Sequence, residues 1–189
     1  MDMTQLVERQ KRFFSTGATR NVENRKKALN TLLQGLERRE EELLAALKAD
    51  WGKGAFEGYM SEVGMVRAEA RHALKHVAKW SRPKRVKGPL SQFPSRGEIL
   101  REPYGTALII APWNYPVQLN LVPLISALAA GCTAVVKPSA YAPATSHALA
   151  QLLGECFPPE YVAVVEGGRA EHTPLLEQPL GRTSFTATP

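Results

Sequence analysis

The sequence has little cysteine, no long apolar run and no secretion signal. Its two cysteines, Cys132 and Cys156, lie in the apolar contexts "AAGCTAVV" and "LGECFPP", and two are too few for a disulfide framework, so we expect reduced core thiols. No apolar run reaches the roughly 18 residues that a membrane-spanning helix needs. The N-terminal "MDMTQLVERQKRFF" lacks the apolar core of a signal peptide. These absences predict a cytoplasmic protein without a transmembrane segment.

Two motifs that would point directly to a ligand are also missing. The glycine fingerprint G-x-G-x-x-G of many dinucleotide-binding proteins does not occur. His72 and His76 lie four residues apart on one face of a charged helix, but no third ligand has suitable spacing. We therefore predict a solvated face there and no metal site.

Basic residues are unevenly distributed along the chain. Residues 1–102 contain 21 Lys and Arg against 13 Asp and Glu, whereas residues 103–189 contain 3 against 5. The excess peaks at residues 79–88, "KWSRPKRVKG", which has no aromatic interleaving beyond Trp80 and no nucleic-acid-binding motif. We expect a solvated basic turn or an oligomer contact there, and no nucleic-acid partner.

The N-terminal part of the sequence shows the spacing of apolar residues that is typical of helices. Leucines recur at three- and four-residue steps from Leu29 to Leu47, which predicts one long amphipathic helix ending near "DWGKG". A second helix is expected from Ala55 to Trp80 and stops before Pro83. The inward face predicted for this second helix comprises Phe56, Tyr59, Met60, Val63, Val66, Ala70, Ala73 and Val77.

The pattern changes twice after this helical part. Residues 82–105 are rich in Pro and Gly around a short alternating segment, which indicates a hairpin-like connector of an oligomerisation type. Short apolar strands then alternate with helices: "TALIIA", "CTAVVKP", "YVAVVEGG" and a last strand ending "SFTATP". Such alternation predicts a parallel sheet. The predicted fold class is α/β, with a helical N-terminal layer (1–81), a connector (82–105) and an incomplete Rossmann-like parallel sheet (106–189).

Unusual residues follow the ends of these strands, where open parallel sheets bind ligands. They lie in the segments "PWNYP", "KPSA", "EGG" and "TATP". Asn114 in the first segment could tie down its own loop, or its side-chain N–H group could donate to developing negative charge. Lys137 in the second could bind ribose hydroxyls or a phosphate, or could reach out to solvent from the strand end. Gly167 could allow close backbone approach to a ligand, or only make the turn.

Two segments of the sequence resemble a known family. The segment "REPYGTALIIAPWNYPVQLNLVPLISALAAGCTAVVKPSA" is similar to the N-terminal half of an aldehyde dehydrogenase, and "ALKADWGKGAFEGYMSEVG" is similar to its class 3 or fatty-aldehyde branch. The resemblance implies oxidation of an aldehyde to a carboxylic acid with NAD or NADP. The family's nucleophilic cysteine and general-base glutamate would lie beyond residue 189, so we expect a cofactor-binding part that is inactive alone.

The resemblance also implies residue roles. Asn114 would donate to the oxyanion formed on the aldehyde substrate, and a full-length form would be a homodimer. Many members have Glu after "KPS", where this chain has Ala140; without that carboxylate, we expect NADP to be tolerated beside NAD. The residues expected to bind the cofactor are Ile110, Pro112, Trp113, Lys137, Ser139, Gly167, Thr186 and Thr188.

Two other functions stay open on the sequence alone. One is a fragment of an acyl-CoA-type reductase of the same superfamily, against which the class 3 similarity argues. The other is a non-catalytic module that binds a nucleotide or another protein, which a stable and monodisperse isolated chain would favour.

Overall fold

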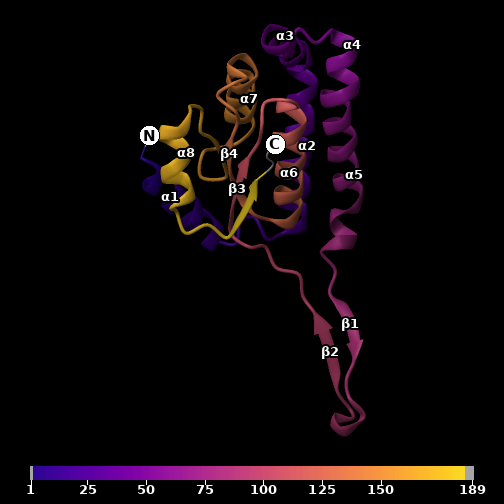
Figure 1. The fold of residues 1–189 in the computed structure, drawn as a ribbon. Coiled ribbons are helices and arrows are strands. Elements are labelled where there is room, and N and C mark those ends of the chain that lie inside the picture. The colour runs from indigo at the N-terminus through magenta and orange to yellow at the C-terminus, as the bar shows by residue number, and fades with distance from the viewer. Residues whose placement is uncertain (1, 186–189) are drawn as a thin grey trace.

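A four-stranded parallel sheet forms the centre of the computed structural model, which describes residues 2–185. The strand order is β5–β4–β3–β6, so β3 lies between the strand that follows it in the chain and the last strand (Figure 1). The strands are β3 (Thr106–Ile110), β4 (Thr133–Lys137), β5 (Val162–Val164) and β6 (Arg182–Phe185). This confirms the predicted α/β class with an incomplete Rossmann-like sheet.

The two central strands are buried along their whole length. Every residue of "TALII" in β3 and "TAVVK" in β4 is buried, as expected where helices cover both faces of a parallel sheet. Alternate side chains point to opposite faces: Ile109 and Val136 join the larger apolar core, whereas Leu108 and Val135 join a smaller one. The sheet therefore separates two cores of unequal size.

Two layers of helices cover one face of the sheet, and a single layer covers the other. The larger core is built by α6 (Pro116–Ala130) and α7 (Pro143–Cys156), with an outer layer of α2 (Val22–Arg38), α3 (Glu40–Trp51) and α5 (Gly64–Trp80). On the opposite face lie α1 (Met3–Ser15) and α8 (Arg169–Leu176) (Figure 1). Within residues 2–185, no helix has the length and apolar character needed to cross a membrane.

The segment between α5 and β3 extends away from the body as an arm (Figure 1). It contains the antiparallel strands β1 (Lys84–Lys87) and β2 (Arg96–Ile99), joined through the short 3₁₀ turn η2 (Leu90–Gln92). Two apolar side chains near its tip are almost fully exposed, Leu90 at 92% and Phe93 at 82%. The arm therefore carries apolar surface that the rest of the described chain does not cover.

Both predicted N-terminal helices are interrupted, and this corrects the sequence interpretation. The leucine period continues through Arg39, yet the backbone there leaves helical geometry (φ −107°, ψ 17°) and separates α2 from α3. The second predicted helix consists of α4 (Ala55–Gly58), the π-helical turn η1 (Tyr59–Val63) and α5. A π turn contains more residues than an α turn, so the helical period is not kept through it. Phe56 before the turn and Met60 within it, both predicted to point inward, are 81% and 57% exposed.

A close contact between α2 and α7 yields a stability prediction. A methyl group on Gly35 would come within 2.5 Å of Cys156 Sγ and 3.0 Å of Leu152 Cδ1, whereas one on Gly154 would meet nothing within 4 Å. We expect Gly35→Ala to lower the free energy of unfolding by about 1–3 kcal/mol through overpacking. The matched control Gly154→Ala should raise it by up to about 1 kcal/mol. Urea unfolding followed by circular dichroism measures both, and an equal gain for the two variants would contradict the packing.

Candidate functional site

The strand order creates a switch point at the carboxyl edge of the sheet. From β3 the chain passes to β4 on one side, and it later returns to place β6 on the other side. Ligands of open parallel sheets bind in the crevice at such a point. The loop of residues 111–115, which holds Asn114, follows β3 directly. The structure thus places this loop where the fold favours binding.

A cavity of about 270 Å³ lies at the same edge, around Lys137 at the end of β4. Lys137 is only 4% exposed, and its Nζ donates to the carbonyl oxygens of Pro138 (2.9 Å) and Gly167 (2.5 Å). Burial lowers the pKa of the Lys137 ammonium, and the nearby Glu171 carboxylate opposes that shift. Because an ammonium has three N–H donors, one remains available for a ligand.

The turn after β5 forms another wall of this cavity. Gly167 adopts φ +117°, which favours glycine, and a side chain there would collide with the Glu171 carboxylate. Glu171 Oε2 in turn accepts the N–H of Gly168 at 2.7 Å. Arg169 and His172 also line the cavity, and no carboxylate does among the residues described. The cavity is therefore suited to an anionic or hydroxyl-bearing ligand.

The Asn114 side chain has one end engaged and one end free. Its Oδ1 accepts the backbone N–H of Tyr115 at 3.1 Å, which is the loop-fixing bond of the first interpretation. Its amide N–H₂ group donates to no acceptor in the part of the chain that the structure describes. The same side chain can therefore stabilise its loop and still donate two hydrogen bonds to a ligand.

Residues of the helical layer hold this loop in place. Lys53 Nζ donates to the Asn114 carbonyl oxygen at 3.1 Å and to Glu62 Oε1 at 2.5 Å. It also lies 4.4 Å from the centre of the Tyr115 ring, a cation–π contact. Trp51 stacks on Trp113 with ring centres 4.8 Å apart. The α3–α4 turn is thus packed against the loop.

The carboxylate of Glu62 completes this arrangement. It is fully buried (0% exposed), and its Oε2 accepts the backbone N–H groups of Val117 at 2.7 Å and Gln118 at 3.3 Å. These are among the free N–H groups of the first turn of α6, where the helix dipole favours negative charge. Sequence reasoning missed Lys53 and Glu62, because no local pattern links them to a helix that begins more than fifty residues later.

The predicted cofactor residues fall into three groups. Ile110, Lys137, Ser139 and Gly167 line one cavity. Pro112 is buried and Trp113 faces Trp51, so neither lines that cavity. Thr186 and Thr188 lie outside the described residues. The structure therefore brings together half of the predicted set, and Asn114 stands in the loop beside it.

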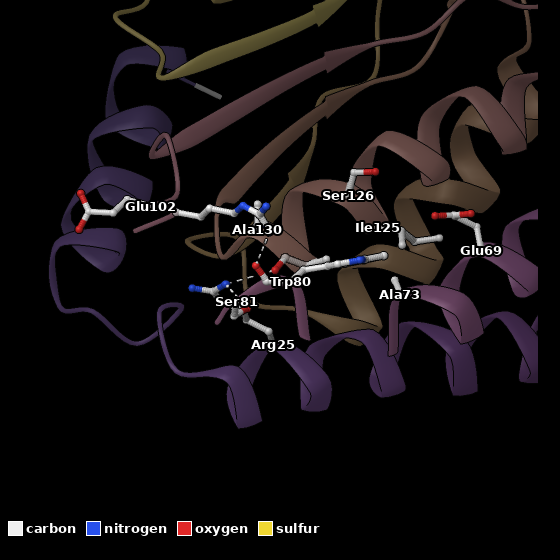
Figure 2. Close-up of a pocket in the computed structure, with 11 residues that line it drawn as sticks. Arg25, Glu69, Ala73, Trp80, Ser81, Glu102, Ile125, Ser126 and Ala130 are labelled. Carbon is white, nitrogen blue, oxygen red and sulfur yellow. Dashed lines mark hydrogen bonds between the residues drawn. The ribbon is translucent and has the colours of Figure 1, made fainter. Parts of the chain in front are cut away.

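A second cavity, of about 300 Å³, lies at the base of the arm (Figure 2). The buried guanidinium of Arg25 donates to the Thr19 carbonyl (3.1 Å), Ser81 Oγ (3.1 Å) and the Ala129 carbonyl near the end of α6 (3.3 Å). The Arg25 side chain thus connects the ends of α5 and α6 by hydrogen bonds. Because α6 returns from the carboxyl edge to the amino edge of the sheet, this cavity lies at the end opposite to Asn114, and no predicted site residue lines it.

Comparison with known proteins identifies the family. The model of the aldehyde dehydrogenase family matches residues 1–187. The chain belongs to this family. It is 40% identical over 94% of its length to the 4,4′-diaponeurosporen-aldehyde dehydrogenase of Staphylococcus aureus, and 38% identical over 99% of its length to aldehyde dehydrogenase family 3 member H1 of Arabidopsis thaliana. It covers 39% of each of these relatives.

Solved structures agree with this assignment. A substrate-bound aldehyde dehydrogenase of Staphylococcus aureus superimposes with a TM-score of 0.94 at 39% identity, over 96% of this chain and 40% of that one. A betaine aldehyde dehydrogenase of the same species, solved with NAD⁺, gives a TM-score of 0.78 at 25% identity, over 90% and 34%. The predicted class 3 relationship is confirmed, since several family 3 members match almost the whole chain.

The two thiols of this aldehyde dehydrogenase chain are unsuited to nucleophilic attack. Cys132 is buried and Cys156 is half-buried, and burial raises the pKa of both thiols. A protonated, covered thiol reacts slowly, because the thiolate is the nucleophile. No group of three or more metal-ligating side chains occurs within the described range either. The rings of His72 and His76 lie with centres 4.2 Å apart and are tilted by 31° to each other.

Thiol labelling tests this placement. At pH 7 we expect iodoacetamide to modify both Cys132 and Cys156 at least about tenfold more slowly than a cysteine in a short peptide. In denaturant both should react at the peptide rate, which is the control for accessibility. Rapid labelling of either thiol in the folded chain, read by mass spectrometry, would contradict the burial described above.

Proposed function

We propose that this chain provides the cofactor-binding part and the oxyanion donor of an NAD(P)-dependent aldehyde dehydrogenase. The observation that carries the proposal is the free side-chain N–H₂ group of Asn114 at the switch point of the sheet, in the loop next to the Lys137 cavity. The name of the Staphylococcus relative specifies an aldehyde substrate. We infer an aldehyde substrate for the present chain as well.

The hydrogen-bond donors and the shape of the Lys137 cavity fit a dinucleotide. Lys137 offers its remaining N–H to a ribose hydroxyl, while the Gly167–Gly168 turn lets backbone approach the ligand closely. A bound dinucleotide would supply the hydride acceptor for aldehyde oxidation. Asn114 donates to the oxygen on which negative charge develops, and an amide keeps its donors at every working pH. We propose that residues outside this chain supply the nucleophile and the general base, and that the chain is inactive alone.

Substitution of Asn114 tests its role. In a longer form that contains the whole catalytic machinery, Asn114→Ala should lower kcat by about 10²–10³ because one oxyanion donor is lost. Cofactor affinity should remain unchanged, since Asn114 does not line the Lys137 cavity. Gln118→Ala serves as a control, because only the backbone of Gln118 is bonded to Glu62. A kcat within twofold of the parent for Asn114→Ala would exclude the proposed role.

We further propose that the cavity accepts both NAD and NADP. Ala140 places no carboxylate at the cavity, and Arg169 lines it without an ion-pair partner among residues 2–185. Negative charge near the ribose would repel a 2′-phosphate, whereas a guanidinium can bind it through two hydrogen bonds. The charge of the lining therefore favours tolerance of NADP.

The adenosine half of each cofactor provides a direct test on the chain itself. We expect 2′,5′-ADP to bind at least as tightly as 5′-AMP in calorimetric titrations. Arg169→Gln should weaken 2′,5′-ADP by about tenfold, the loss of one charge-assisted contact, and leave 5′-AMP unchanged. Lys137→Met should weaken both ligands. A strong preference for 5′-AMP in the parent chain would refute the proposal.

The arm and the thiols support two further proposals, one on the oligomeric state and one on the location in the cell. We propose that a full-length form is a homodimer in which the arm contacts the partner, because Leu90 and Phe93 expose apolar surface. We also propose a cytoplasmic location, which two free cysteines in a chain without disulfides favour.

A further inference from the structure

We propose that Lys53 and Glu62 are positioning residues that hold Asn114 for oxyanion binding. They touch neither of the cavities described above; they act on the backbone on both sides of the Asn114 side chain. The proposal rests on the proposed role of Asn114, but the arrangement of the loop can be measured without any activity.

Glu62 fixes the C-terminal side of the loop. The π turn η1 carries its carboxylate into the core, where it accepts the N–H groups of Val117 and Gln118 in the first turn of α6. α6 has no side-chain cap of its own at Tyr115, and Pro116 has no N–H to offer. Glu62 is therefore the group that satisfies the start of α6, and it determines where the helix begins relative to Asn114.

Lys53 fixes the centre of the loop. Gly52 ends α3 in a left-handed conformation (φ +65°), and this sharp turn brings Lys53 over the loop. Its ammonium bonds to the Asn114 carbonyl and covers the Tyr115 ring, so the peptide plane between these two residues is held from one side. The orientation of that plane sets the direction of the Asn114 side chain, which bonds to the N–H of the same peptide.

The pair also controls charge at the site. A buried carboxylate next to the loop would repel an oxyanion that forms at Asn114, because charges interact strongly in a water-poor environment. Lys53, at 2.5 Å from Glu62, cancels that negative charge. Glu62 can thus anchor the helix without opposing the chemistry, and we infer that this is why a cation accompanies it.

The first experiment measures the loop in the chain itself. Amide hydrogen exchange is followed for Lys53→Met, Lys53→Arg and Glu62→Gln, together with the side-chain ¹⁵N–¹H signals of Asn114, which are assigned by their absence in Asn114→Ala. The matched control is Arg67→Met, which removes another partly buried cation that pairs with two carboxylates, Glu37 and Glu40, away from the loop.

Local loosening is the expected result. Exchange within residues 113–118 should accelerate at least about tenfold in Lys53→Met and Glu62→Gln, the Asn114 side-chain signals should shift, and Lys53→Arg should restore most of the protection. Arg67→Met should leave this segment unchanged. Unaltered exchange in Lys53→Met would overturn the proposal, and so would equal acceleration throughout the chain, which is the signature of a merely structural role.

The second experiment connects the pair to Asn114 in a longer, active form. Lys53→Met should lower kcat by about tenfold or more with little change in the KM for the cofactor, and it should cause no further loss in an Asn114→Ala background. Additive losses would overturn the positioning role. If Asn114→Ala alone leaves kcat unchanged, the proposed function fails, while the exchange data still decide whether the pair holds the loop.

Discussion

The buried ion pair of Lys53 and Glu62 is the interaction that connects the helical layer to the carboxyl edge of the sheet. A fully buried carboxylate is costly unless it is paired and hydrogen-bonded, and Glu62 has one cation and two helix N–H groups as partners. The geometry of the pair is therefore imposed on everything bonded to it, including the loop of Asn114.

The same principle operates at the next helix. α7 also begins without a cap from its own N-cap residue, Ala142. Asp50, the residue before the last one of α3, accepts the N–H groups of Ala144 (3.1 Å) and Thr145 (2.8 Å) and the hydroxyl of Thr145 (2.7 Å). The helical layer thus satisfies the starts of both α6 and α7 with carboxylates. The helical layer and the starts of α6 and α7 cannot shift against each other without leaving these helix ends unsatisfied.

The sequence could predict what local patterns determine. Continuous apolar runs indicated the buried strands, and the unusual residues at their ends indicated the edge where Lys137 and Asn114 lie. The pattern failed where tertiary contacts override it. The leucine period runs through Arg39, although the helix is interrupted there, and the π turn Tyr59–Val63 leaves no signal in a helical period. Glu62 could not be assigned to α6, because its role depends on packing between distant segments.

The two sequence interpretations of Asn114 turn out to be compatible. One end of the amide accepts the N–H of Tyr115 and restricts the side chain, so the other end can point in a fixed direction at little entropic cost on binding. Aspartate could accept the same N–H but would bring negative charge toward an oxyanion, and serine offers a single donor. An amide combines an acceptor for the loop with neutral donors for the ligand. Its restriction by the loop therefore suits the proposed oxyanion role, because a donor preorganised before the reaction needs no reorientation when charge develops.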